Sequence, residues 1–168
     1  MNYIRGRLSL LPTRESVLQI PRRVEYALRA AIALAKVPDT ERVSFKCVAD
    51  DQEIPRDYLA KILRTLVDAG IVASRRGANG GYRLARLPKE ITFLEVIEAA
   101  DSPVALNLCT ESGTGCCKSG DCQMVSVWQA AEDAVRIVFG RTTLADVLGK
   151  KPLTLQELTA NGRECPEF

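Results

Sequence analysis

The chain has 168 residues, of which 46% are hydrophobic, and carries a formal net charge of +2 without any histidine. This length suits one compact domain with an appended element but hardly two full domains. The sequence has no apolar run long enough for a membrane span, and "LSLL" near the basic start is too short for a signal peptide. We therefore expect a cytoplasmic protein, in which six cysteines indicate metal or redox chemistry before disulfides.

Positive charge is concentrated in one segment. Residues 56–89 hold eight lysines and arginines against two acidic residues, whereas residues 90–168 hold six against twelve. Such a basic segment favours a polyanionic partner such as DNA. An ordinary solvated surface is the alternative that charge alone leaves open.

The first predicted helix starts near Val24, where apolar residues begin to recur at helical spacing and Pro21 suits the first turn. Residues 1–20 precede it and are expected to be an extension, either disordered or the product of a mis-assigned start codon. The stripe that should face the core consists of Val24, Ala27, Leu28, Ala31, Ile32 and Ala35.

Two further helices are predicted, joined by a tight turn. Ser44 is expected to cap the short helix "FKCVADD", in which Cys47 should be a buried small hydrophobe. Pro55 suits the first turn of the next helix, and Gly70 supplies its stop. Because that helix is basic on its exposed side, the pair is typical of a helix-turn-helix motif. Its predicted apolar stripe is Leu59, Ile62, Leu63 and Leu66.

A hairpin follows directly. "IVASR" and "YRLAR" alternate in polarity, and "RGANGG" between them contains residues that tolerate positive φ. A hairpin in this place is the wing of a winged helix, so we assign residues 21–102 to a winged helix-turn-helix DNA-binding domain. The fold class expected is mainly α with a small β-hairpin.

The rest of the chain is predicted to form a cysteine-rich loop and a long helix. Thr92 and Glu95 form a capping-box pattern that starts another helix, and residues 103–122 show no periodicity. A helix over residues 123–139 carries an apolar seam, and Thr143 should cap a last short helix, "LADVL". We expect residues 123–150 to be dimerisation helices, with packing of the seam on its own domain as the alternative, and residues 151–168 to be a flexible tail. The seam is Met124, Trp128, Ala131, Val135 and Val138.

The third helix and the wing supply the predicted DNA contacts. Guanidinium and ammonium groups neutralise phosphates, and the start of such a helix reaches base edges in the major groove. Arg76, at the strand tip, suits insertion into a narrow minor groove. A nucleotide-phosphate loop is disfavoured because the glycines precede a strand and lack a "GKS/T" ending. The predicted contacts are Ser44, Arg56, Asp57, Lys61, Arg64, Arg75, Arg76 and Arg83.

The stretch "IPRDYLAKILRTLVDAGIVASRRGANGGYRLAR" resembles the winged-helix regulators that include the iron-sulfur cluster regulator IscR and the nitric-oxide-sensing repressor NsrR. The similarity runs from about Pro21 to Leu148. It implies a dimeric winged helix with a long crossing helix, a cluster-binding cysteine loop and, in most members, repression of transcription. It also implies major-groove positions at Pro55, Arg56, Asp57, Ala60 and Lys61, with a minor-groove position at Arg76; some relatives carry a glutamate where this chain has Ala60.

The loop cysteines suit an iron-sulfur cluster, either 2Fe-2S or 4Fe-4S. Thiolates are its natural ligands, and the glycines between Cys109, Cys116 and Cys122 allow the loop to wrap around one centre. These three match the cluster ligands of the resembling family. Cys117 is an alternative to Cys116, although adjacent cysteines rarely ligate one centre together.

The resemblance also suggests a fourth ligand. Some relatives use a histidine where this chain has Val125, whereas others use an acidic residue in a "DYALR"-like stretch, which here reads "VEYALR". We therefore nominate Glu25, from the same chain or across a dimer, with a solvated or salt-bridged glutamate as the alternative. Zinc held by four thiolates, a disulfide switch and inert cysteines are alternatives to the cluster, and Cys165 is expected to be incidental.

The function favoured by the sequence is a dimeric transcriptional regulator, most simply a repressor, whose binding to a double-stranded DNA operator depends on a cluster that senses redox state, nitric oxide or iron-sulfur status. A clusterless regulator controlled by thiols or zinc is the first alternative, and a winged helix that docks a protein is another. An enzyme is disfavoured because the chain has no histidine, catalytic constellation or nucleotide fingerprint.

Overall fold

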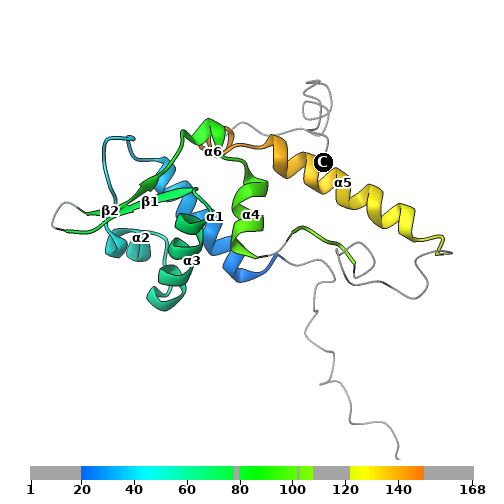
Figure 1. The fold of residues 1–168 in the computed structure, drawn as a ribbon, viewed down its shortest axis with the longest axis horizontal. Helices are drawn as coiled ribbons and strands as arrows, with labels where there is room; N and C mark the ends of the chain where they lie inside the picture. Colours follow the sequence, from blue (N-terminus) through cyan, green and yellow to red (C-terminus); the bar gives the residue numbers. More distant parts are fainter. Residues whose placement is uncertain (1–19, 78–79, 102, 108–121, 150–168) are drawn as a thin grey trace, which may run out of the picture.

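The computed structural model describes residues 20–77, 80–101, 103–107 and 122–149. These residues form a mainly helical fold with one hairpin, as predicted (Figure 1). Residues 1–19, most of the cysteine loop and the tail from residue 150 lie outside the described part. The elements are α1 Arg22–Ala35, α2 Phe45–Asp51, α3 Arg56–Asp68, β1 Val72–Arg75, β2 Gly81–Leu84, the 3₁₀ turn η1 Pro88–Glu90, α4 Phe93–Ala100, α5 Val125–Arg141 and α6 Leu144–Leu148.

The core is built around α1, which contacts α3, α4 and α6. Ala27, Ala30 and Ala31 are fully buried, and their small side chains let the neighbouring helices approach closely. The predicted stripe of α3 packs against them, with Leu59, Leu63 and Leu66 all completely buried. Three residues predicted for the inward face of α1 are only half-buried, because that face is centred on the alanines and Leu34; they are Leu28, Ile32 and Ala35.

The signals predicted for the ends of α2 and α3 agree with the structure. The Ser44 Oγ accepts a hydrogen bond of 3.1 Å from the Cys47 N–H and caps α2. Pro55 precedes the first residue of α3, and Gly70 follows that helix with φ +69°. The prediction that Cys47 is buried was wrong: its side chain is exposed, because α2 presents Val48 and Ala49 to the core and Cys47 lies on another side of this short helix.

The wing is an antiparallel hairpin in which Val72 pairs with Leu84 and Arg75 with Gly81. Tyr82 also forms two backbone hydrogen bonds with Val43, one in each direction and each of 2.9 Å. The segment before α2 therefore acts as a one-residue third strand. This pairing fastens the wing to the helix-turn-helix.

The long helix α5 begins and ends two residues later than predicted, and it packs on α4. Phe93 and Phe139 have ring centroids 6.5 Å apart, and Arg136 lies 2.8 Å from Glu98. Figure 1 shows α5 extending away from the other helices, and none of its residues is buried. In the described part of the chain, no helix is both long and apolar enough to span a membrane.

Candidate nucleic-acid interface

The turn between α2 and α3 fixes the orientation of α3 relative to α1 and α2. Glu53 adopts a positive φ of 51°, and the Ile54 N–H donates to the Ala49 carbonyl at 3.0 Å. The Ile54 side chain is buried in the core, and Arg29 on α1 donates to the carbonyl of Gln52. The helix-turn-helix is therefore anchored from both sides of the turn.

The exposed side of α3 carries the predicted major-groove residues. Arg56, Asp57, Lys61 and Arg64 are all exposed, opposite the buried leucines. Arg56 lies 3.8 Å from Asp50, and Arg64 lies 3.9 Å from Asp68. Because such exposed ion pairs contribute little free energy, the two arginines can exchange them for DNA phosphates at small cost.

Sequence reasoning missed Tyr58 in this set. It is 57% exposed on α3, and its ring meets the ring of Tyr26 on α1 edge to face, with centroids 6.3 Å apart. The Arg29 guanidinium lies 6.0 Å from the Tyr26 ring centroid. The signal was present in the sequence, because Tyr58 falls outside the leucine stripe and directly follows Arg56 and Asp57.

A hollow of about 610 Å³ lies between α3 and the wing. Arg64, Arg75 and Arg76 contribute its cationic groups, and Ala60 from α3 also lines it. Its size, its position beside the exposed face of α3 and its arginines suit a phosphate backbone. The remaining lining residues are Ser44, Phe45, Val67, Ser74, Gly77, Gly80, Gly81 and Tyr82.

The tip of the wing depends on its glycines. The Gly80 N–H donates to the Gly77 carbonyl at 2.9 Å, and Gly77 has φ +109°. A Cβ on Gly80 would lie 2.4 Å from the Arg75 carbonyl oxygen, so a side chain cannot be accommodated there without a shift. Arg76 is exposed beside this turn, whereas residues 78 and 79 lie outside the described part.

Arg83 is placed differently from the other predicted contacts. It is half-buried on β2, and its guanidinium donates to the Asp39 carbonyl at 3.5 Å. It therefore also supports the loop between α1 and α2. Its contact with DNA stays a prediction.

The structure describes only part of the predicted ligand set. Glu25 is exposed and lies 3.7 Å from Arg29, one turn along α1, in agreement with the salt-bridged alternative. Cys122 is a half-buried free thiol just before α5. Within the described ranges, no three His, Cys, Asp or Glu side chains are grouped so that they could hold a metal. The predicted ligands Cys109 and Cys116, with the alternative Cys117 and the tail residue Cys165, lie outside those ranges.

The predicted seam of α5 is only partly covered in the single chain. Met124 is 61% exposed, and its neighbour Val127 is 65% exposed. Trp128, Ala131, Val135 and Val138 complete the predicted seam and are half-buried. An apolar face of this length on one protruding helix favours a protein partner.

Residues 20–150 match the family model Rrf2, described as an iron-dependent transcriptional regulator. The chain belongs to the Rrf2 family. It is 34% identical over 132 residues to a Mycobacterium tuberculosis protein named as an HTH-type transcriptional regulator, covering 79% of this chain and 82% of that one. It is 31% identical over 132 residues to NsrR of Geobacillus kaustophilus, covering 78% and 90%.

Solved structures agree with this assignment of the Rrf2 fold. The structure of CymR, the global cysteine regulator of B. subtilis, matches with a TM-score of 0.66 and 29% identity, covering 80% of this chain and 99% of that one. This Rrf2 protein is therefore a DNA-binding transcriptional regulator with a winged helix-turn-helix, and not an enzyme. The resemblance inferred from the motif of α3 and the wing is confirmed.

Proposed function

We propose that this Rrf2 protein is a homodimeric repressor whose binding to its operator is controlled by an iron-sulfur cluster. The observation that carries the DNA-binding part is the hollow between α3 and the wing, which Arg64, Arg75 and Arg76 line. The cluster part rests on the cysteine loop and on the description of the family as iron-dependent. Repression, the dimer and the cluster are the steps beyond family membership.

In this proposal α3 enters the major groove with its exposed side towards the bases. Arg56, Lys61 and Arg64 meet phosphates or base edges, and the exposed ring of Tyr58 suits an apolar contact such as a thymine methyl group. Arg76 enters the adjacent minor groove, where the negative potential favours a guanidinium. Ala60 offers no polar group, so base preference at its position comes from its neighbours.

Cys109, Cys116 and Cys122 would hold the cluster, with Cys117 as the alternative to Cys116. Their donor set fits, because three thiolates in a glycine-containing loop match iron-sulfur ligation, and Cys122 is a free thiol. The bound cluster would supply iron that responds to oxidants and nitric oxide. Glu25 is the proposed fourth ligand. To bind the cluster it would have to break its ion pair with Arg29. Arg29 also donates a hydrogen bond to the Gln52 carbonyl, in the turn before α3.

The proposed dimer joins two copies through α5. Regulators with a helix-turn-helix commonly read two half-sites, and that arrangement requires a symmetric partner. The apolar seam of α5, none of whose residues is buried in the single chain, offers a self-complementary face for that purpose. The cysteine loop directly precedes α5 in the sequence. Loss of the cluster would therefore change the constraint on the N-terminal end of the proposed dimer helix.

The proposal is tested by purifying the protein without oxygen and reconstituting its cluster. We expect a brown protein with visible absorption and with bound iron and sulfide. Cys109→Ser should lose the colour, whereas Cys47→Ser, which removes an exposed thiol from α2, should keep it. A wild-type protein that stays colourless after reconstitution would refute cluster binding and leave DNA binding untouched.

The second candidate is a clusterless regulator controlled by thiols. The similarity to CymR, the global cysteine regulator of B. subtilis, favours this candidate. In that case the reconstituted wild-type protein would stay colourless, yet its operator binding would still respond to oxidants. Zinc held by Cys109, Cys116, Cys117 and Cys122 would instead give a colourless protein containing stoichiometric zinc.

A further inference from the structure

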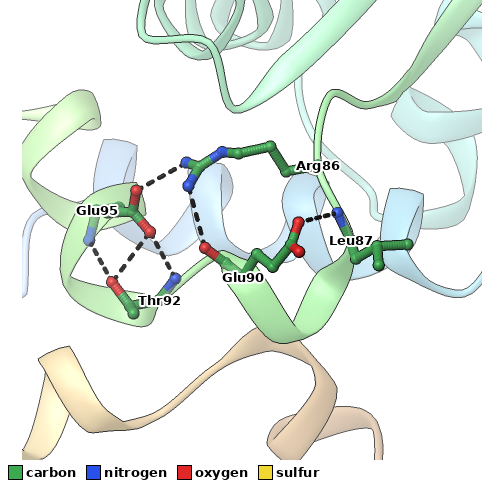
Figure 2. Close-up of polar contacts among 5 residues, drawn as sticks. All are labelled: Arg86, Leu87, Glu90, Thr92 and Glu95. Carbon is green, nitrogen blue, oxygen red and sulfur yellow. Dashed lines mark hydrogen bonds and ion pairs between the residues drawn. The ribbon is translucent and has the colours of Figure 1, made fainter.

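Arg86 lies where the wing ends, and the function proposed above gives it no role. After β2, the Ala85 N–H donates to the Ile71 carbonyl at 2.9 Å, and Arg86 is the next residue. Its guanidinium donates to the Glu90 carbonyl at 3.0 Å and to the Glu95 carboxylate at 2.7 Å (Figure 2). One side chain thus spans the connection between the wing and α4.

The acceptor of Arg86 is itself held at the start of α4. The second carboxylate oxygen of Glu95 accepts from the Thr92 N–H at 2.8 Å, and the Glu95 N–H donates to the Thr92 Oγ1 at 3.2 Å. Figure 2 shows the guanidinium of Arg86 aimed at this capping box. The Glu95 carboxylate cannot rotate without breaking the capping box of α4. Arg86 is therefore bonded to a side chain that is fixed at the N-terminus of that helix.

The start of α4 is fixed in turn to the end of α5. The Phe93 N–H donates to the Thr142 carbonyl at 2.8 Å, and the Leu144 N–H donates to the Ile91 carbonyl at 3.0 Å. Thr142 directly follows α5 and is only 4% exposed. A continuous set of polar contacts therefore runs from the base of the wing to the junction of α4, α5 and α6.

We propose that Arg86 is a positioning residue, which sets the angle of the wing against this junction and so holds Arg76 where it contacts DNA. A guanidinium with two acceptors restricts rotation more than a single contact does. Both Arg86 and Glu95 are 39% exposed, so their ion pair contributes little to the free energy of unfolding. Arg86 also lies at the opposite end of the hairpin from Arg76, away from the proposed DNA contact.

The inference rests on the proposed contact of Arg76 with DNA, and a double-mutant cycle separates the two. Binding to a DNA site that the wild-type protein selects from a random pool is measured by fluorescence anisotropy for Arg76→Ala, Arg86→Ala and the double variant. We expect Arg76→Ala to bind about tenfold more weakly and Arg86→Ala about fivefold more weakly, and the double variant to match Arg76→Ala. Lys89→Ala removes a charge from the same connection without breaking the bridge, and it should bind within about twofold of wild type.

Losses that multiply in the double variant would mean that Arg86 acts without the wing, and would overturn the inference while leaving the Arg76 contact intact. Wild-type affinity in Arg86→Ala would overturn it as well. Wild-type affinity in Arg76→Ala would overturn the wing contact and the inference together. Arg86→Lys keeps the charge but cannot bridge both acceptors. In case Arg86→Ala does not fold, Arg86→Lys replaces it in the double-mutant cycle with Arg76→Ala. Its affinity should lie between those of Arg86→Ala and wild type, with an unchanged urea midpoint.

Discussion

Replacing Gly81 with alanine should disconnect the wing from the helix-turn-helix. Gly81 starts β2 with φ +143°, in a region that side chains rarely adopt. A Cβ at this position would lie 2.6 Å from the Val43 carbonyl oxygen and 3.1 Å from the Val43 carbonyl carbon. Both atoms belong to backbone that pairs with Tyr82, so the clash cannot be relieved by turning a flexible side chain.

The expected cost follows from these two effects. Holding a residue other than glycine in such a backbone conformation costs about 1–3 kcal/mol. Moving Val43 away would break its two hydrogen bonds of 2.9 Å with Tyr82, each worth about 1 kcal/mol. We therefore expect the free energy of unfolding to fall by about 3–5 kcal/mol, and DNA affinity to fall as well because the wing is no longer anchored.

Urea unfolding followed by circular dichroism measures this effect, with Gly149→Ala as the matched control. Gly149 has φ −67°, and the nearest heavy atom to an added Cβ lies 3.5 Å away. Alanine there should leave the protein unchanged or stabilise it by up to about 1 kcal/mol. A Gly81→Ala protein within about 0.5 kcal/mol of wild type would refute the reasoning from backbone strain.

Three further predictions concern the core, the dimer and the DNA face. Leu63→Ala empties a fully buried site and should lower the free energy of unfolding by about 2–5 kcal/mol in urea titrations; a smaller loss would mean that α1 and α3 close the cavity. Val135→Asp places a charge on the apolar seam of α5 and should give a monomer in sedimentation velocity, whereas Ser126→Asp, on the same helix but outside the seam, should stay dimeric. Arg64→Ala should lower the slope of log K against log salt by about 1 in DNA titrations, and an unchanged slope would place Arg64 away from phosphates.

Local signals predicted most of the helices and the wing. Ser44, Thr92 and Thr143 each accept the expected backbone hydrogen bond at a helix start, because capping depends on residues only three positions apart. The leucine stripe of α3 was also predicted correctly, because one face of that helix is buried along its length. The α5 helix was displaced by two residues, and its N-cap residue, Met124, makes no side-chain capping bond.

What the sequence could not predict are contacts between distant segments. The pairing of Val43 with Tyr82 and that of Thr92 with Thr143 leave no periodic pattern in the sequence, because each joins only one residue from each segment. Tyr58 was missed as a surface aromatic, and its neighbour Tyr26 becomes visible only when α1 crosses α3. Cys47 was expected inside because it was assigned to the apolar face of its helix, whereas only the side with Val48 and Ala49 reaches the core.

The central claim is that a cluster on the cysteine loop changes how this Rrf2 protein binds DNA. One measurement tests it most directly: the anaerobic affinity of a single protein preparation for its selected DNA site, before and after the cluster is removed by a chelator. We predict a change of at least about tenfold, or about 1.4 kcal/mol of binding free energy, with the wild-type protein. Cys109→Ser should bind with the affinity of the stripped protein under both conditions. Equal affinities of the clustered and stripped wild-type protein would contradict the account.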